Sequence, residues 1–422
     1  MFPSELGVML MQYKVTTQID GKDVLAGTLY QNVRYGQETA SFSYDSSYLE
    51  NPKAFSLAPD MPLGSGAFHS EGLKEFRALE DCMPDRWGRN LLFRAERSRA
   101  YREQQTPRVL FEIDYLTGVS DKTRQGAIRI WDETGQSLAP EEKGVPREVD
   151  LPALLNSADL AAVDMDADIR DLLEAGSSLG GARPKASVQD QQGTLWIAKF
   201  PKSDEDSISD ISAWEKVSLD LMSECGINVP ESRLIRIKGR SVLLLKRFDR
   251  VGDLRIPYIS GLTAIQGNDG NNYSYLELVE FIEDAGSNPQ EDIRELWRRA
   301  LFSCAIGNTD NHMRNYGFLR SGLGWKLSPA FDVNPTEGSH AKYLSTGLDF
   351  GNRGADIEIA LNMCEYYRVG ASEAKNQMRE MARALQSWRS KAHKQGISKA
   401  SIDKMASCFD GGIEKLLVAA KR

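Results

Sequence analysis

The chain has 422 residues, of which 41% are hydrophobic and 27% are charged, and its formal net charge is −8. This length and composition are those of a globular protein with roughly two or three packed cores. The acidic balance argues against a stand-alone nucleic-acid-binding protein, because neutralising phosphates needs a basic face. No apolar run approaches the length of a membrane span, so the sequence predicts no membrane association.

Cysteine usage and the first residues indicate the compartment. The five cysteines lie far apart and form no C-x-x-C pair, and an odd number fits no closed disulfide framework. Reduced thiols are typical of cytoplasmic proteins. Residues 1–14 carry no basic leader before their short apolar run, which argues against a signal peptide. A cytoplasmic location is therefore expected.

Strand-like segments come first in the chain. Residues 1–45 are rich in β-forming side chains, in pieces that turn signals separate. Residues 70–104 have helical spacing that is broken near Pro84, and residues 126–131 predict a further strand. A polar stretch near 140–152 that contains prolines is predicted to be a linker.

The remainder of the chain passes from strands to helices. Residues 186–200 predict a hairpin, residues 209–225 predict a helix, and a second β pair is expected around Gly239. After about residue 255 helical periodicity dominates. The predicted fold class is therefore α+β, with a β-rich lobe followed by a mostly helical lobe.

A glycine-rich turn, SSLGGARPKAS at residues 177–187, precedes the predicted hairpin. Gly180 and Gly181 allow a tight turn and a close backbone approach, and successive N–H groups in such a turn can hold an anion. Arg183 and Lys185 add positive charge. The alternative is a solvated glycine turn, because the segment is not a P-loop and has only part of the protein-kinase glycine pattern.

Lys199 lies inside an apolar strand sequence, WIAKF. An ammonium group in a strand interior needs a partner. In kinases a lysine at this place binds nucleotide phosphates and pairs with a glutamate of the following helix. Glu215, on the predicted helix at 209–225, is the candidate partner. The alternatives are an edge-strand lysine in solvent and an ordinary surface glutamate.

Asp310 and Asn315, in GNTDNHMRN, have the D-x-x-x-x-N spacing of a kinase catalytic loop. Phosphoryl transfer needs a carboxylate that accepts the hydroxyl proton, and oxygen ligands for Mg²⁺. Asp332 follows a predicted hairpin with its turn at 321–324, which would return it to Asn315. The alternative is a hairpin capped by Asp and Asn side chains. His312 is expected to organise the loop rather than to bind a metal.

With these motifs in this order, the chain resembles the HipA family of serine/threonine kinases, the toxins of bacterial toxin–antitoxin modules. GGARPKAS, IAKFP, LKRFDR, GNTDNHMRN and LSPAFDVNP are similar to segments of that family, and MPDRWGRNLL is similar to part of its N-terminal subdomain. The resemblance implies a protein-kinase-like bilobal fold. It implies a β-rich N-terminal subdomain at 1–145, a kinase N-lobe at 146–254 and a helical C-lobe at 255–422.

The resemblance also implies a role for each motif. Asp310 would be the proton-accepting base, and Asn315 and Asp332 would hold Mg²⁺. Ser178 stands where the family has an autophosphorylated serine whose modification ejects the loop and silences the kinase, and the adjacent Ser177 is the alternative. The residues implied in binding ATP, with 246–248 as the adenine hinge, are Gly180, Gly181, Ala182, Arg183, Lys185, Lys199, Lys246, Arg247, Phe248, His312, Asn315 and Asp332.

The function implied is that of an ATP-dependent kinase that phosphorylates a serine of a cellular protein, such as an aminoacyl-tRNA synthetase. The implied partners are a small helix-turn-helix antitoxin similar to HipB and, through it, operator DNA. Two other functions stay open from the residues alone: a small-molecule kinase on a related scaffold, and a non-catalytic nucleotide-binding regulator. The basic stretch at 86–102 is either a contact for such partners or a solvated amphipathic helix.

Overall fold

Contacts within the chain group it into two compact units. Unit 1 comprises Met1–Ala198 and Asp249–Ile259, and unit 2 comprises Lys199–Phe248 and Ser260–Arg422. The expected division into three segments at residues 145 and 254 stays a prediction. The computed structural model describes residues 8–70, 72–138, 144–163, 172–173, 183–205, 209–337 and 343–422.

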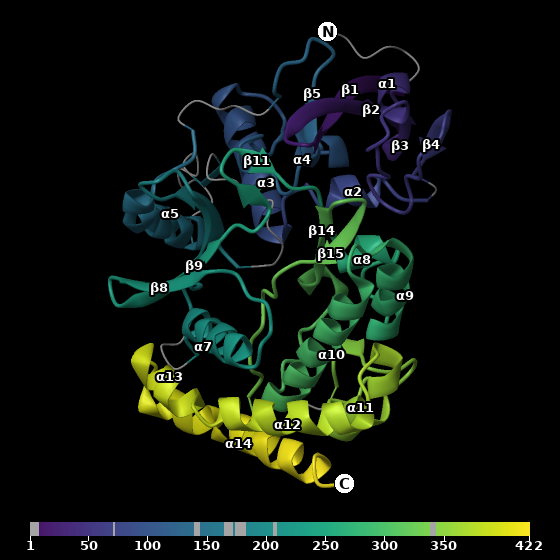
Figure 1. The fold of residues 1–422 in the computed structure, drawn as a ribbon. Coiled ribbons are helices and arrows are strands. Elements are labelled where there is room, and N and C mark those ends of the chain that lie inside the picture. Colours follow the sequence, from purple (N-terminus) through teal and green to yellow (C-terminus); the bar gives the residue numbers. More distant parts are fainter. Residues whose placement is uncertain are drawn as a thin grey trace. The chain divides into compact units, whose positions relative to one another are not determined.

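Unit 1 contains a five-stranded sheet with the strand order β4-β3-β2-β1-β5 (Figure 1). The three long strands that begin the chain pair as antiparallel neighbours. Their alternating side chains point to opposite faces, so Val15, Leu29 and Phe42 reach the core while polar neighbours stay outside. The strands of this sheet are β1 (Val8–Ile19), β2 (Lys22–Arg34), β3 (Gln37–Tyr44), β4 (Ala67–His69) and β5 (Arg129–Trp131).

Helices and short strands complete unit 1. The predicted break near Pro84 is present because Asp85 caps the following helix, where its carboxylate accepts the Gly88 N–H at 2.8 Å. The other elements are α1 (Ser46–Leu49), α2 (Arg77–Glu80), α3 (Arg86–Arg102), α4 (Glu112–Thr117), η1 (Glu148–Asp150), α5 (Leu151–Val163), β6 (Lys185–Gln189), β7 (Leu195–Lys199), β10 (Arg250–Val251) and β11 (Leu254–Arg255).

Two boundaries in unit 1 differ from the prediction. The strand expected from residue 126 begins only at Arg129, because Gly126 has a left-handed backbone with φ of 71°. The linker expected near 140–152 becomes regular structure by Glu148, and α5 follows at once. Pro152 stands in the first turn of α5, where a proline removes no helical hydrogen bond, so it does not prevent the helix.

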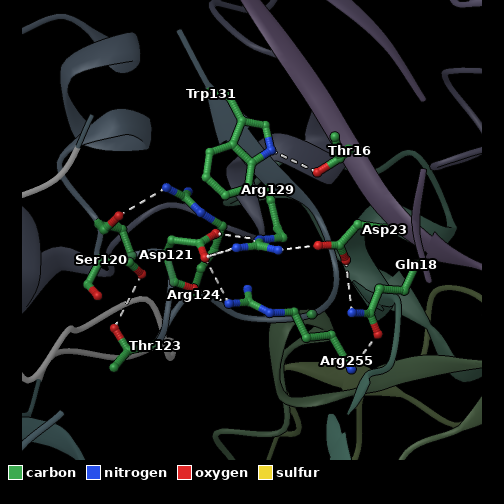
Figure 2. A network of polar contacts seen from close by, with 12 residues as sticks. Thr16, Gln18, Asp23, Ser120, Asp121, Thr123, Arg124, Arg129, Trp131 and Arg255 are labelled. Carbon is green, nitrogen blue, oxygen red and sulfur yellow. Dashed lines mark hydrogen bonds and ion pairs between the residues drawn. The ribbon is translucent and has the colours of Figure 1, made fainter. Parts of the chain in front are cut away.

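An arginine–aspartate network holds the β10–β11 hairpin to the sheet of unit 1, as Figure 2 shows. The buried carboxylate of Asp121 accepts Arg129 Nη2 at 2.6 Å and Arg255 Nη2 at 3.0 Å. Arg129 also pairs with Asp23, and the Arg255 backbone N–H donates to Gln18 Oε1 at 2.7 Å. Burial alone would raise the pKa of Asp121, but the two arginines outweigh it and lower that pKa. The network is therefore ionised.

Unit 2 is mostly helical, and the expected α+β class with a helical C-terminal region is confirmed. Three aromatic side chains join its last helices to α7: Trp388 stacks on Phe409 at 4.7 Å between ring centroids, and Trp214 stacks on Phe409 at 5.8 Å. Helix α14 also approaches α10 closely, because a Cβ at Gly412 would lie 1.8 Å from the Ala305 carbonyl oxygen. Figure 1 draws the C-terminal helices in yellow.

The elements of unit 2 follow one another with short connections. They are α7 (Ile211–Glu224), β8 (Ser232–Ile237), β9 (Arg240–Lys246), β12 (Tyr258–Ser260, which begins in unit 1), α8 (Gly261–Ala264), β13 (Tyr273–Ser274), α9 (Tyr275–Ala285), α10 (Pro289–Ile306), η2 (Met313–Asn315), β14 (Gly317–Ser321), β15 (Gly324–Leu327), β16 (Thr346–Gly347), α11 (Ile357–Asn362), η4 (Cys364–Tyr367), α12 (Ala371–Leu385), α13 (Trp388–Lys394) and α14 (Lys399–Ala419). Within the described residues, no helix is both long and apolar enough to span a membrane.

Candidate active site

Three charged side chains of unit 2 meet at one point. The ammonium of Lys199, the last residue of β7, donates to Glu215 Oε1 of α7 at 2.6 Å and also to Asp332 Oδ1. The same Glu215 oxygen accepts the backbone N–H of Asp332 at 3.2 Å. The side chains of Lys199 and Glu215 are 12% and 4% exposed, whereas that of Asp332 is 30% exposed. Glu215 therefore holds both the lysine and the backbone of the aspartate.

The electrostatics of this triad follow from burial and charge. Burial disfavours a charged Lys199, but the carboxylates of Asp332 and Glu215 outweigh it and raise the pKa of Lys199. Burial raises the pKa of Glu215, against the influence of the Lys199 ammonium. A buried ammonium is costly without partners, and here it has two. Lys199 is therefore a fixed positive charge.

The hairpin before Asp332 has the predicted turn, with Ser321 opposite Gly324 in the β14–β15 register. Asp332 itself has a left-handed backbone with φ of 56°, a conformation that aspartate adopts more readily than most residues. Asp332 and Asn315 line the same small cavity of about 10 Å³. The chain thus returns Asp332 to the loop that carries Asn315.

The loop that begins at Gly307 carries the D-x-x-x-x-N motif. Gly307 ends α10 with φ of 63°, which turns the chain out of the helix. The Asp310 side chain is 82% exposed, and His312 Nε2 lies 3.8 Å from its Oδ1. Asn315 Nδ2 donates to the Asp310 carbonyl oxygen at 2.6 Å, which closes the loop on itself. Asp310 is therefore a carboxylate on the surface whose backbone is held in place.

Asn311 organises this loop, although the sequence pattern directed attention to His312. Its side chain is buried, and its Oδ1 accepts the N–H groups of Ser345 and Thr346 at 2.8 and 3.2 Å. Its Nδ2 donates to the Tyr275 hydroxyl and to the Thr346 carbonyl. His312 is 47% exposed. An asparagine between apolar flanks was the available signal, since a buried carboxamide must satisfy both of its ends.

The cavity at Asp332 has the donors that a magnesium ion prefers. Asp332 offers a carboxylate and Asn315 a carboxamide, and Asn308, which is buried beside them, has an Oδ1 without a hydrogen-bond partner. A volume of about 10 Å³ admits roughly one body the size of a water molecule. Among the described residues no three His, Cys, Asp or Glu side chains form a metal-binding group. A cation here would therefore depend on amide oxygens beside Asp332.

Lys185 was expected to contact nucleotide phosphates, and within unit 1 its ammonium lies 2.8 Å from Asp85 Oδ2. The two side chains are only 4% and 2% exposed. Asp85 is the residue that caps α3, so one carboxylate serves both a helix start and the first residue of β6. Arg183 is half-buried. The other residues of the predicted phosphate loop lie outside the described residues: Ser177, Ser178, Gly180, Gly181 and Ala182.

The predicted hinge residues have three different surroundings. Lys246 ends β9 and is exposed, with Nζ 3.2 Å from a carboxylate oxygen of Glu231. Arg247 is buried. The ring of Phe248 packs on that of Phe331 with centroids 5.8 Å apart, and Phe331 directly precedes Asp332. Phe248 is therefore the hinge residue that the structure connects to the triad.

Comparison with known families decides the relationship of the chain. Residues 177–390 match the model of the HipA-like C-terminal domain, and residues 18–111 match that of the HipA N-terminal domain. The first match alone covers more than half of the chain. The chain belongs to the HipA family.

Individual relatives of this HipA family member are distant. Toxin YjjJ of Escherichia coli K12 is 30% identical over 183 residues, which cover 38% of each protein. A proposed kinase of Haemophilus influenzae is 26% identical over 184 residues, which cover 38% of this chain and 52% of that protein. The chain therefore spans about half, or less, of the length of these sequence relatives.

A solved structure covers nearly the whole chain. It is the HipA of a Shewanella oneidensis MR-1 toxin–antitoxin system, in complex with HipB and its operator DNA. The TM-score is 0.67 at 16% sequence identity, over 98% of this chain and 97% of that chain. At this identity the likeness shows the fold, so the fold of this chain is that of HipA.

Proposed function

We propose that this chain is an ATP-dependent protein serine/threonine kinase of the HipA toxin type. It transfers the γ-phosphate of ATP to a serine hydroxyl of a cellular protein. The observation that carries the proposal is the meeting of Lys199, Glu215 and Asp332, with Asn315 beside the same cavity as Asp332. A buried ammonium held by a helix glutamate, next to an aspartate and an asparagine, is the set of groups that positions nucleotide phosphates in kinases.

Each residue of the triad has a distinct task in the proposed reaction. Lys199 presents a fixed positive charge to a phosphate oxygen, and Glu215 keeps the ammonium and the Asp332 backbone in register. Asp332 and Asn315 would hold Mg²⁺, which when bound neutralises charge on the phosphate oxygens. The Asn308 oxygen that lacks a partner offers a further donor at this place.

Asp310 is the proposed base. It accepts the proton of the serine hydroxyl while the hydroxyl oxygen bonds to the γ-phosphorus, and the bond from that phosphorus to the β–γ bridging oxygen breaks to release ADP. The hydrogen bond from Asn315 to the Asp310 carbonyl fixes the backbone of the base. Its 82% exposed side chain suits a hydroxyl that arrives on another protein.

The finer parts of the proposal rest on the family. We propose that residues 180–185 form the phosphate loop, that residues 246–248 contact adenine, and that phosphorylation of Ser178 or Ser177 silences the kinase. The solved Shewanella HipA is in complex with HipB and operator DNA, which supports proposing a HipB-like antitoxin and operator DNA as partners. An aminoacyl-tRNA synthetase as target and a cytoplasmic location belong to the same proposal.

One experiment tests the proposed function. The protein is incubated with Mg-ATP, and phosphate is located by mass spectrometry in the wild type, in Asp310→Ala and in Asp403→Ala, a control at an exposed aspartate of α14. We expect phosphate on Ser178 or Ser177 in the wild type and the control. The rate in Asp310→Ala should fall by about 10²-fold to 10⁴-fold. Equal phosphate in all three proteins would contradict the assignment of the base.

A growth assay separates a toxin from a small-molecule kinase. Expression of the wild type in bacteria is expected to arrest growth, and Asp310→Ala is expected to relieve the arrest. Arrest of equal strength with Asp310→Ala would show that toxicity does not depend on phosphoryl transfer.

A further inference from the structure

A second cavity of unit 2, about 240 Å³ in volume, opens beside the loop that carries Asp310. We call it the side pocket. His312, Met313 and Arg314 of that loop form part of its wall. Since His312 Nε2 lies 3.8 Å from Asp310 Oδ1, one side chain separates the pocket from the proposed base. Whatever occupies the side pocket is therefore near the reacting hydroxyl.

The walls of the side pocket are held together by buried hydrogen bonds. Asn311 joins the loop to Ser345 and Thr346, which line the opposite wall. Thr346 pairs in parallel register with Tyr273, and the Tyr273 hydroxyl accepts the N–H of Asn268 at 2.6 Å. Residues 268–273 are thereby fixed as the third wall. The pocket is a built feature rather than a gap between loops.

The polar lining of the side pocket suits a peptide backbone. Asn268, Asn271 and Asn272 all belong to its wall, and all three are exposed. A carboxamide carries both a donor and an acceptor, so it can pair with a peptide N–H or C=O without a change of protonation. The volume is also smaller than the roughly 300–1,000 Å³ of pockets that bury small-molecule ligands.

The charges of the side pocket are unequal. Arg314 and Asp269 neutralise each other through Nε at 2.9 Å and Nη2 at 2.7 Å. Arg353 lines the same pocket and is half-buried. Within the part of the chain that the structure describes, the guanidinium of Arg353 forms no ion pair or hydrogen bond. The lining therefore offers one positive charge that awaits an anion.

We propose that the side pocket binds the serine-containing segment of the protein substrate, and that Arg353 recognises an acidic side chain of that segment. The inference rests on the proposed function, because it places the segment so that its hydroxyl reaches Asp310. The asparagines pair with the backbone of the segment, and the Arg353 guanidinium pairs with a carboxylate in two hydrogen bonds. The kinase thus selects acidic acceptor segments.

A binding experiment tests the proposal without depending on catalysis. Short fluorescent peptides with one serine, flanked on either side by glutamates, glutamines or lysines, are titrated with the full chain and followed by anisotropy. The wild type is expected to bind the glutamate peptide at least about tenfold more tightly than the glutamine peptide. In Arg353→Gln this preference is expected to fall to within about twofold.

Arg383→Gln is the matched control, because Arg383 is an exposed arginine of α12 outside the pocket. It should keep the full preference for the glutamate peptide. An unchanged preference in Arg353→Gln, a wild type that binds the lysine peptide best, or no binding of any peptide would overturn the proposal. Failure of the proposed kinase function would be recognised separately, as absence of phosphate after incubation with Mg-ATP while the peptide preference persists.

Discussion

The carboxylate of Glu215 accepts the backbone N–H of Asp332 at 3.2 Å, although 117 residues separate the two along the chain. The same oxygen accepts the Lys199 ammonium at 2.6 Å. A helix glutamate thus sets the position of a lysine and of an aspartate at once. Because rigid placement of charge is the main requirement of phosphoryl transfer, Glu215 is expected to matter for rate as well as for stability.

Glu215→Gln removes half of this buried ion pair but keeps an oxygen that can accept both hydrogen bonds. We expect the free energy of unfolding to fall by about 1–3 kcal/mol and autophosphorylation to slow at least about tenfold. Chemical denaturation and a phosphorylation time course measure the two effects. The control is Glu224→Gln on the same helix, where an exposed glutamate pairs with Lys391 at 2.6 Å. That surface pair should change stability by less than about 1 kcal/mol. Equal effects of the two variants would contradict the special role of Glu215.

Asn311→Ala tests the organisation of the loop. The substitution leaves the N–H groups of Ser345 and Thr346 without their acceptor, so it should cost about 1–3 kcal/mol of stability for each buried group left unpaired. It should also slow phosphoryl transfer more than it weakens ATP binding, because Asn311 adjoins Asp310 and touches no predicted nucleotide contact. Denaturation, ATP titration and phosphorylation rates are measured in parallel. His312→Ala, next along the chain and 47% exposed, should change stability by less than about 0.5 kcal/mol. A larger loss there than in Asn311→Ala would return the organising role to His312.

Two neighbouring glycines of α14 provide a test of helix packing. A Cβ at Gly412 would lie 1.8 Å from the Ala305 carbonyl oxygen, whereas a Cβ at Gly411 would meet no atom within 4 Å. Gly412→Ala should therefore destabilise unit 2 by about 1–3 kcal/mol or more, because helices α10 and α14 must separate. Gly411→Ala should stabilise it by about 0.5–1 kcal/mol through helix propensity. Thermal unfolding of both variants decides the question, and a stabilised Gly412→Ala would mean that the two helices are not so closely packed.

Glu75 predicts a dependence of stability on pH. Burial raises its pKa from an ordinary 4.5 to about 8, the Phe76 N–H acts against this, and the nearby Glu80, Glu112 and Glu38 add to it. The folded protein therefore keeps this proton where the unfolded chain has lost it. Stability should fall as the pH rises from 4.5 to about 8 and then level off.

Glu75→Gln should flatten this part of the pH profile, because the amide never ionises. The measurement is the thermal unfolding midpoint of wild type and variant at steps from pH 4.5 to about 8. The variant should be the more stable protein at the upper end of the range. Parallel profiles in the two proteins would show that Glu75 is not the group responsible.

The local elements of this fold could be predicted from the sequence because each is encoded by residues close together in the chain. Alternating side chains in the first 45 residues predicted β1, β2 and β3, and the turn at 321–324 predicted the β14–β15 register. The spacing of Asp310 and Asn315 predicted the loop and its chemistry. Periodicity and turn propensity act over a few residues, so they can be recognised without the tertiary structure.

Only the tertiary structure decided which distant groups meet. Lys185 pairs with Asp85 from 100 residues away, residues 249–259 join unit 1 through Arg255 and Asp121, and Asn311 rather than His312 holds the loop. Such contacts follow no period in the chain, because they satisfy buried charges and amides with whatever partner the packing supplies. The sequence by itself determined the strands, helices and motif spacing, and packing decided which carboxylate each cation contacts.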